Sequence, residues 1–194
     1  MANPIEDHAR IDEYLTSPDF SARYEIRINA PAPVVYRCLL RSDFSELWLV
    51  RLLMTVLSGK RLPRSPLPSD LRQRLQGTGF VILAEAASEE LVLGIAGRFW
   101  RPDGGRCTDL VADDFVGFSR PGYAKVAWNF KLQANSPAES TVLSTETRIK
   151  CFGRAALWKF RLYWSLVGPF SGLMRKAILE QVKTAAESTL IKGS

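Results

Sequence analysis

The sequence predicts an α+β fold, in which an antiparallel sheet packs against one long C-terminal helix. Two patterns support this class. Apolar and polar residues alternate with a period of two in at least four segments between residues 20 and 151, as in strands with one buried face. Between residues 154 and 191 the apolar residues instead recur every three or four positions, which indicates a helix. A long helix cannot bury such a face alone, so we expect the strands to cover it.

The composition is that of an ordinary globular protein. The chain has 194 residues, of which 46% are apolar and 24% are charged, and this suits one domain spanning residues 1–194. The net charge of +6 is modest and spread along the chain, so we interpret it first as surface solvation. An anionic membrane surface stays open as a transient partner. Nucleic acid is not expected as a partner, because no motif combines basic and aromatic residues.

The cysteines indicate a reducing compartment. Cys38, Cys107 and Cys151 are far apart and show no paired spacing, which argues against a disulfide framework and against a zinc site. The first residues are polar and acidic, unlike those of a signal peptide. The most apolar run, residues 47–57, is too short to cross a bilayer. We therefore expect a cytoplasmic protein.

The first half of the chain predicts one strand and two short helices. After a loose segment over residues 1–18, alternation from residue 20 to residue 30 predicts a strand that Pro31 ends. Pro31 and Pro33 suit the first turn of a helix that runs through residues 34–39. A second helix is expected to begin at Ser42 or Asp43, which are good N-caps, and to reach residue 57. Residues 58–78 form a basic, proline-rich connection, which is either a lid or a solvated linker.

The second half predicts four more strands and the final helix. Alternation places strands at residues 80–85, 91–96, 124–133 and 143–151, whereas residues 107–118 are too irregular to assign. We predict the final helix from about residue 155 to residue 188, with a kink at Pro169. Cations such as Arg175 fall mostly off its apolar stripe. The predicted stripe consists of Leu157, Phe160, Trp164, Val167, Phe170, Met174, Ile178 and Val182.

Two stretches carry a resemblance to a known family. Residues 24–36 form a strand that ends in Ala-Pro and leads into a helix, and residues 143–149 form the strand before the last helix. With the order of the elements, these stretches resemble the START-like, or SRPBCC, superfamily, and residues 160–164 and 169–173 are similar to an uncharacterised bacterial branch of it. The superfamily includes lipid-transfer domains and polyketide cyclases or aromatases. The resemblance implies a helix-grip fold, in which a curved sheet wraps the long helix and leaves a cavity between them.

The resemblance also implies which side chains line this cavity. The wall would combine the inward residues of the last two strands with one face of the helix. Trp100 lies in the opposite phase from the inward residues of its own segment, so it is placed outside the wall unless a bulge intervenes. The predicted ligand-binding residues are Trp128, Phe130, Thr145, Thr147, Ile149, Phe160, Trp164 and Val167. The two threonines either present hydroxyls to a ligand or bond locally to the backbone, and the aromatic residues either line a cavity or fill it.

Catalytic and metal-binding residues are not predicted. His8 is the only histidine and lies in the loose N-terminal segment, so a histidine-based metal site or hydrolytic triad is not expected. Asp109, Asp113 and Asp114 lack the ligand spacing and central glycine of a calcium loop. Cys151 falls on an inward strand face, as a structural thiol does. No glycine pattern suits a phosphate or a dinucleotide, so no cofactor is expected.

Three functions remain open on the sequence. The favoured hypothesis is a protein that binds a hydrophobic small molecule, such as a lipid, a sterol or a polyketide-like compound, between the sheet and the helix. The alternatives are an enzyme of the cyclase or aromatase type and an interaction module with a filled core. The absence of an acid–base pair in the predicted cavity favours binding over catalysis. The ligand's identity and the oligomeric state stay open.

Overall fold

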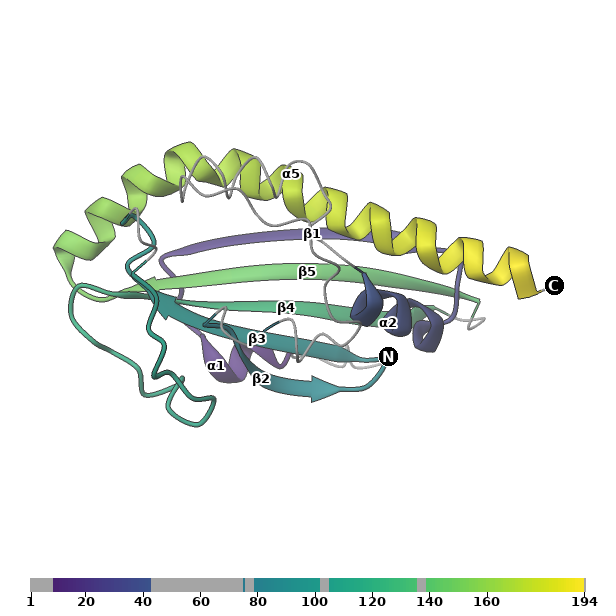
Figure 1. Ribbon diagram of the computed structural model, residues 1–194, viewed down its shortest axis with the longest axis horizontal. Coiled ribbons are helices and arrows are strands. Elements are labelled where there is room, and N and C mark those ends of the chain that lie inside the picture. Colours follow the sequence, from purple (N-terminus) through teal and green to yellow (C-terminus); the bar gives the residue numbers. More distant parts are fainter. Residues whose placement is uncertain (1–8, 43–74, 76–78, 102–104, 136–138, 194) are drawn as a thin grey trace, which may run out of the picture.

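The computed structural model describes residues 9–42, 75, 79–101, 105–135 and 139–193, and it confirms the α+β class. Five antiparallel strands form one curved sheet in the order β1–β5–β4–β3–β2, and the long helix α5 arches over one face of it (Figure 1). The strands are β1 (Phe20–Ile28), β2 (Val81–Ala86), β3 (Glu90–Gly97), β4 (Ala124–Asn135) and β5 (Ser140–Cys151). The helices are α1 (Ile11–Tyr14), α2 (Ala32–Arg41) and α5 (Arg154–Gly193).

The first strand and the helix after it form as the sequence predicts. In β1 partly buried and exposed residues alternate up to the buried Ile28, because this edge strand has one face toward α5 and the other toward solvent. Pro31 occupies the N-cap position of α2, and Pro33 follows in the first turn. The Ser42 hydroxyl ends the helix by donating a hydrogen bond of 2.7 Å to the Cys38 carbonyl. The second predicted helix and nearly all of residues 58–78 lie outside the described residues, so those expectations remain predictions.

Helix α5 confirms the period of the sequence pattern but corrects its register. The helix continues through Pro169, and Phe160, Val167, Ile178 and Val182 are buried as predicted. Phe170 does not belong to the buried stripe that the sequence predicts, since it is 48% exposed. The buried face instead runs from Val167 through Ser171 and Arg175 to Ile178, in steps of four, four and three residues. The prediction that Arg175 lies off the stripe is therefore wrong, and it rests on the rule that a charged side chain is seldom buried.

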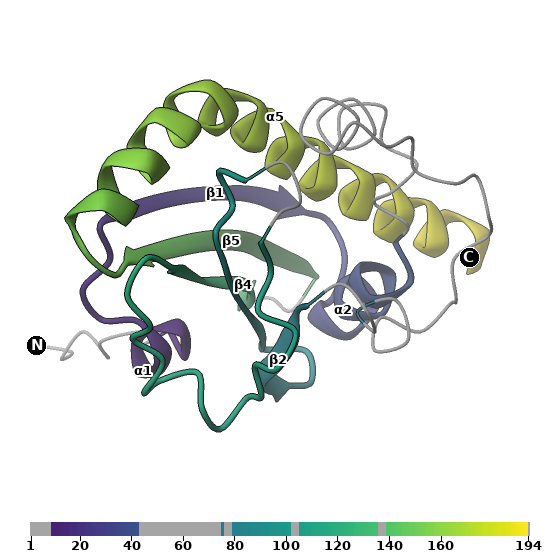
Figure 2. The same ribbon diagram turned by 60° about the vertical axis from the view of Figure 1, so that its left-hand side comes forward.

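A second core covers part of the sheet face that is turned away from α5. Ile11 of α1 and Phe115 of the segment after β3 pack there on Val92 and Ala127. Figure 2 shows α1 on the side of the sheet away from α5. Phe115 approaches the sheet so closely that a Cβ atom on Gly94 would lie 2.8 Å from its ring. Every residue of β3 is therefore buried, whereas alternation alone predicts one exposed face.

A polar network fastens α1 to this outer face. Glu90 accepts one hydrogen bond from the Asn129 amide at 2.6 Å and another from the Arg10 backbone N–H at 2.8 Å. Arg148 pairs with Glu146 at 2.6 Å and also with Asp12 of α1. Strand alternation places Glu146 and Arg148 on the face of β5 that is turned away from α5, and the cover of α1 leaves only 17% and 15% of their side chains accessible. The charged groups of this network are either paired or hydrogen-bonded, so we assign it a structural role.

The described helices also allow a test for membrane-spanning segments. In the part of the chain that the structure describes, no helix combines the length and the apolar character needed to cross a bilayer.

The opposite environments of two phenylalanines on α5 generate a stability prediction. Phe160 is 1% exposed and packs against Phe20, with 5.2 Å between the ring centroids. We expect Phe160→Ala to lower the free energy of unfolding by about 3–5 kcal/mol, because it leaves a cavity. The matched change Phe170→Ala, on the exposed face of the same helix, should stay within about 0.5 kcal/mol of the parent. Urea denaturation measures both values, and equal losses would contradict the register described here.

Candidate functional site

The predicted ligand-binding residues all lie in the layer between the sheet and α5, where they form two groups. Trp128, Phe130 and Thr145 belong to the core beneath α2 and the second half of α5. Ile149, Phe160 and Trp164 belong to a core at the start of α5. Val167 is also buried, and Thr147 stands opposite Trp128 in the register of β4 and β5. The sequence therefore predicted which face of the sheet these residues occupy, and their ligand role remains a prediction.

Trp100 joins the second group, contrary to its phase in the sequence. Its ring lies 6.4 Å from that of Phe160 in an edge-to-face arrangement, and Phe99 makes a similar contact. The reason is that β3 ends at Gly97, so strand alternation no longer determines the direction of the side chains that follow. Trp164, one turn after Phe160 in α5, is half-buried and stacks on the Phe160 ring with 5.6 Å between the ring centroids.

The two threonines of β5 behave differently. The Thr145 hydroxyl accepts a hydrogen bond from the Trp128 indole at 2.7 Å and donates one to the Asn129 carbonyl at 2.8 Å. The Thr145 hydroxyl therefore bonds locally, which was one of the two alternatives for this residue, and its bond to the indole fixes the orientation of the Trp128 ring. The Thr147 hydroxyl accepts a hydrogen bond from the Nε atom of Arg175 at 3.0 Å. Thr147 therefore helps to hold a cation inside the layer between the sheet and the helix.

Arg175 is the residue that sequence reasoning missed. It is 5% exposed, and its Nη1 atom donates a hydrogen bond of 2.7 Å to the Ser171 hydroxyl one turn earlier in α5. The guanidinium also lies 6.0 Å from the centre of the Trp164 ring. Burial lowers the pKa of Arg175, but an arginine with so high an ordinary pKa keeps its charge. Among the described residues, no carboxylate forms an ion pair with it.

The helix approaches β1 closely beside this arginine. Gly172 faces the Tyr24 hydroxyl so tightly that any side chain at this position would collide with it. The Lys176 ammonium lies 5.6 Å from the centre of the Tyr24 ring on the same side of α5. Tyr24 and Lys176 thus form the rim of the layer where it meets β1, next to the buried Arg175.

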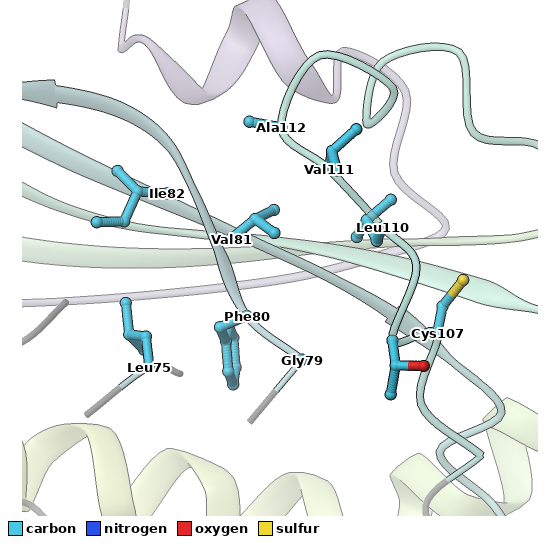
Figure 3. Close-up of a pocket in the computed structure, with 10 residues that line it drawn as sticks. Leu75, Gly79, Phe80, Val81, Ile82, Cys107, Leu110, Val111 and Ala112 are labelled. Carbon is cyan, nitrogen blue, oxygen red and sulfur yellow. The ribbon is translucent and has the colours of Figure 1, made fainter. Parts of the chain in front are cut away.

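A hollow of about 520 Å³ opens at the other edge of the sheet, beside β2 (Figure 3). None of the predicted ligand-binding residues lines it. Phe80 links the two regions, since its side chain lines the hollow and its ring lies 6.2 Å from that of Trp128. Figure 3 shows Phe80 pointing toward α5 and Leu75 pointing away from it toward the strands, with Leu110 and Val111 on the far side of β2. The hollow is lined by Leu75, Gly79, Phe80, Val81, Ile82, Cys107, Thr108, Leu110, Val111 and Ala112.

Cys107 is the polar group of this hollow with a defined hydrogen-bond network. Its thiol donates to Asp109 at 2.9 Å, and Arg120 pairs with the same carboxylate at 2.8 Å. The hydrogen bond from Arg120 holds the pKa of Asp109 below its usual range. Burial, followed by the bond to Asp109, raises the pKa of Cys107, so the thiol stays protonated near neutral pH and is a poor nucleophile.

The described part of the chain contains no cluster of side chains that suits a metal ion. There, no group of three or more histidine, cysteine, aspartate or glutamate side chains could hold a metal ion. The aspartates at 113 and 114 are therefore part of no described metal-binding cluster, and His8 lies outside the described residues. On the face of the sheet toward α5, the described titratable side chains include Tyr24, Tyr163 and Arg175, with Cys151 at the end of β5.

Comparison with known proteins yields distant structural similarities. No protein-family model matches the chain, and no match appears among curated proteins. A conserved protein from Geobacillus kaustophilus is 13% identical, with a TM-score of 0.44 over 88% of this chain and 97% of that chain. A protein from Nitrosospira multiformis is 10% identical, with a TM-score of 0.41 over 85% and 94% of the two chains. The Zhui aromatase/cyclase from Streptomyces sp. R1128 is 14% identical, with a TM-score of 0.33 over 88% and 95%. At these identities the similarities concern the fold alone.

The thiols provide a prediction about the site's chemistry. Burial raises the pKa of Cys151 to about 12, and Cys107 is 5% exposed, whereas Cys38 is only partly buried. At about pH 8, a thiol-reactive probe should therefore label Cys38 first and label the other two cysteines only when the protein unfolds. Peptide mass spectrometry of the labelled protein measures this order. Rapid labelling of Cys151 in the folded protein would contradict its burial.

The same pKa shift predicts how stability depends on pH. The folded state keeps the Cys151 thiol neutral up to a pKa of about 12, while the unfolded chain ionises it near pH 8.5. The unfolded state therefore binds fewer protons in this window, so the free energy of unfolding should fall as the pH rises from about 9 to about 12. Cys151→Ala should show a shallower fall in chemical denaturation, and an unchanged slope would contradict the assignment.

Proposed function

We propose that the protein binds an amphipathic small molecule in the layer between the sheet and α5, with an acidic group of the ligand at Arg175 and its apolar part along the aromatic residues. The observation that carries this proposal is the burial of Arg175 in an apolar layer without a carboxylate among the described residues. A buried charge is costly unless it is paired and hydrogen-bonded. Two hydroxyls and one aromatic face compensate only part of that cost.

The chemistry of the guanidinium determines the class of ligand. It is planar and carries a fork of N–H donors that matches a carboxylate or a phosphate in a bidentate arrangement. The bonds to Thr147 and Ser171 use the Nε atom and one N–H of Nη1, so they orient the group and leave further donors for a ligand. An acidic group bound there would neutralise the charge inside the layer.

The aromatic residues supply the apolar part of the proposed site. Trp128 stands opposite Thr147 across the β4–β5 pair, and its ring lies 4.9 Å from that of Phe130. Phe80 continues this surface toward the hollow beside β2. Apolar ligand surface that is buried here would contribute about 25 cal/mol for each Å² removed from water. The ligand would enter at the β2 edge and reach Arg175 by way of Phe80, Trp128 and Thr147.

A cyclase or aromatase reaction is less well supported than binding. Such a reaction needs groups that donate and accept protons at the substrate. The described carboxylates of Glu90 and Glu146 belong to the network on the opposite face of the sheet, under α1. Burial raises the pKa of Tyr163, so this residue is a poor base near neutral pH. We therefore propose binding as the function.

Ligand affinity tests the proposed role of Arg175. Dodecanoic acid and its methyl ester share the same acyl chain, but only the acid carries a negative charge near neutral pH, and tryptophan fluorescence can follow the titration of either compound. Arg175→Met should weaken binding of the acid by about 10- to 100-fold, since a hydrogen bond to a charged group contributes about 1.5–3 kcal/mol. Binding of the ester should change little. Arg161→Met, at an exposed position of the same helix, is the matched control and should bind the acid normally. Equal losses for acid and ester, or no binding of either compound, would reject the proposal.

Stability separates a ligand-binding arginine from a structural one. A buried charge without a counter-ion is costly, so its replacement by an apolar side chain of similar length removes that cost. We therefore expect Arg175→Met to leave the free energy of unfolding of the ligand-free protein within about 1 kcal/mol of the parent, or to raise it. Chemical denaturation without ligand measures this change. A loss of about 3 kcal/mol or more would mean that Arg175 is retained for the fold.

A further inference from the structure

We propose that the first half of α5 is a docking surface for an anionic lipid bilayer. Its outward side carries an apolar row that we call the outer stripe. The side chains of this row are between 48% and 73% exposed, although large apolar residues are normally buried along a packed helix. This surface is separate from the layer that contains Arg175, and the inference does not depend on a bound ligand. The outer stripe consists of Trp158, Leu162, Leu166, Phe170 and Leu173.

The spacing of the outer stripe shows that it is one continuous surface. Its members follow one another in steps of four, four, four and three residues, so they lie on a single side of the helix. The side chains that face the sheet, such as Phe160 and Val167, occupy the opposite side. The outer stripe therefore lies on the outside of the arch that α5 forms over the sheet (Figure 1). A contiguous exposed apolar surface of this kind is typical of an interaction site.

The charges around the outer stripe indicate an anionic partner. No aspartate or glutamate occurs between Glu146 and Glu180, so the first half of α5 contains no acidic residue. Exposed cations border the stripe at Arg154, Lys159, Arg161 and Lys176. Arg161 also lies 5.8 Å from the centre of the Trp158 ring, which places a cation and an amphipathic aromatic ring side by side.

A bilayer fits this pattern better than a second copy of the chain. Two copies that meet through the same surface would bring the cations of one stripe against the cations of the other. At an anionic membrane, by contrast, leucine and phenylalanine enter the acyl boundary while tryptophan lies at the level of the head groups. Lysine and arginine side chains extend along the apolar surface and place their charges at lipid phosphates. The stripe and its flanking cations thus have the two components of an interfacial membrane-binding helix.

Co-sedimentation with lipid vesicles tests the inference on the full chain. The protein should bind vesicles of phosphatidylcholine that contain phosphatidylglycerol, and it should bind pure phosphatidylcholine vesicles less. Leu166→Ser should weaken binding to the mixed vesicles by about tenfold, because it removes apolar burial in the bilayer. Ile191→Ser is the matched control: Ile191 is 79% exposed, against 73% for Leu166, but it lies beyond the outer stripe. This control should bind as the parent does.

The charge component is tested separately. Lys159→Gln and Arg161→Gln should each weaken binding to the mixed vesicles by about fivefold, and added salt should weaken binding of the parent. Brominated phosphatidylcholine in the mixed vesicles should quench the fluorescence of Trp158, and Trp158→Phe should remove that part of the quenching. Absence of vesicle binding would overturn the inference, as would equal effects of Leu166→Ser and Ile191→Ser. A dimer that Leu166→Ser dissociates, without any binding to vesicles, would show that the stripe is an interface between copies and would overturn it as well.

Discussion

Helix α5 must bury one face along the sheet, and the rest of the molecule is arranged around this requirement. The face turned to the sheet packs on β1, β5 and β4, with Phe160 at one end and Val182 at the other. Aromatic rings from several elements surround Phe160, while aliphatic side chains of α2 and the strands surround Val182. Burial of apolar surface is the dominant favourable contribution to folding, so these two cores account for most of the stability of the layer. The middle of the helix lies between them and contains Ser171 and Arg175.

Charged side chains have different partners on the two faces of the sheet. On the outer face, Arg148 is held by Glu146 and Asp12, and the Glu90 carboxylate receives two hydrogen bonds. This network fastens α1 and leaves its charges compensated. On the face toward α5, Arg175 meets hydroxyl groups and an aromatic ring. A protein of modest stability can retain such a residue when it serves binding, since functional sites often carry a cost in stability. This contrast is the reason that we assign function to Arg175 and structure to Arg148.

The same helix offers two surfaces with different chemistry. Its inward side places a cation in an apolar layer, which suits a small acidic amphiphile. Its outward side places apolar residues among exposed cations, which suits the surface of an anionic membrane. Lipids contain both an acidic head group and an apolar chain, so the two proposals concern related chemistry. They rest on separate residues, because Arg175 is buried while Leu166 is 73% exposed.

Much of the fold could be predicted from local patterns. Alternation with period two located the five strands, and the period of the last segment located α5 within a few residues. The predicted site residues proved to share one layer, because alternation determines which face of a strand a side chain occupies. The aperiodic segment after β3 was not predictable in this way. Its Phe115 packs on Gly94. This contact joins positions that are distant in the chain, so the local sequence around either residue does not predict it.

The sequence by itself determined the five strands, the helices α2 and α5, and the face of the sheet on which α5 lies, since these follow from the periodicity of apolar residues along the chain. Only the tertiary structure decided which polar residues are buried. Arg175 is one cation among many in the sequence, and its burial depends on the rotation of α5 relative to β5, where Thr147 receives it. Phe170 and Leu166 face away from the sheet for the same reason. A packed helix adopts one rotation about its own axis. The apolar stripe of α5 is too broad for the sequence alone to define that rotation.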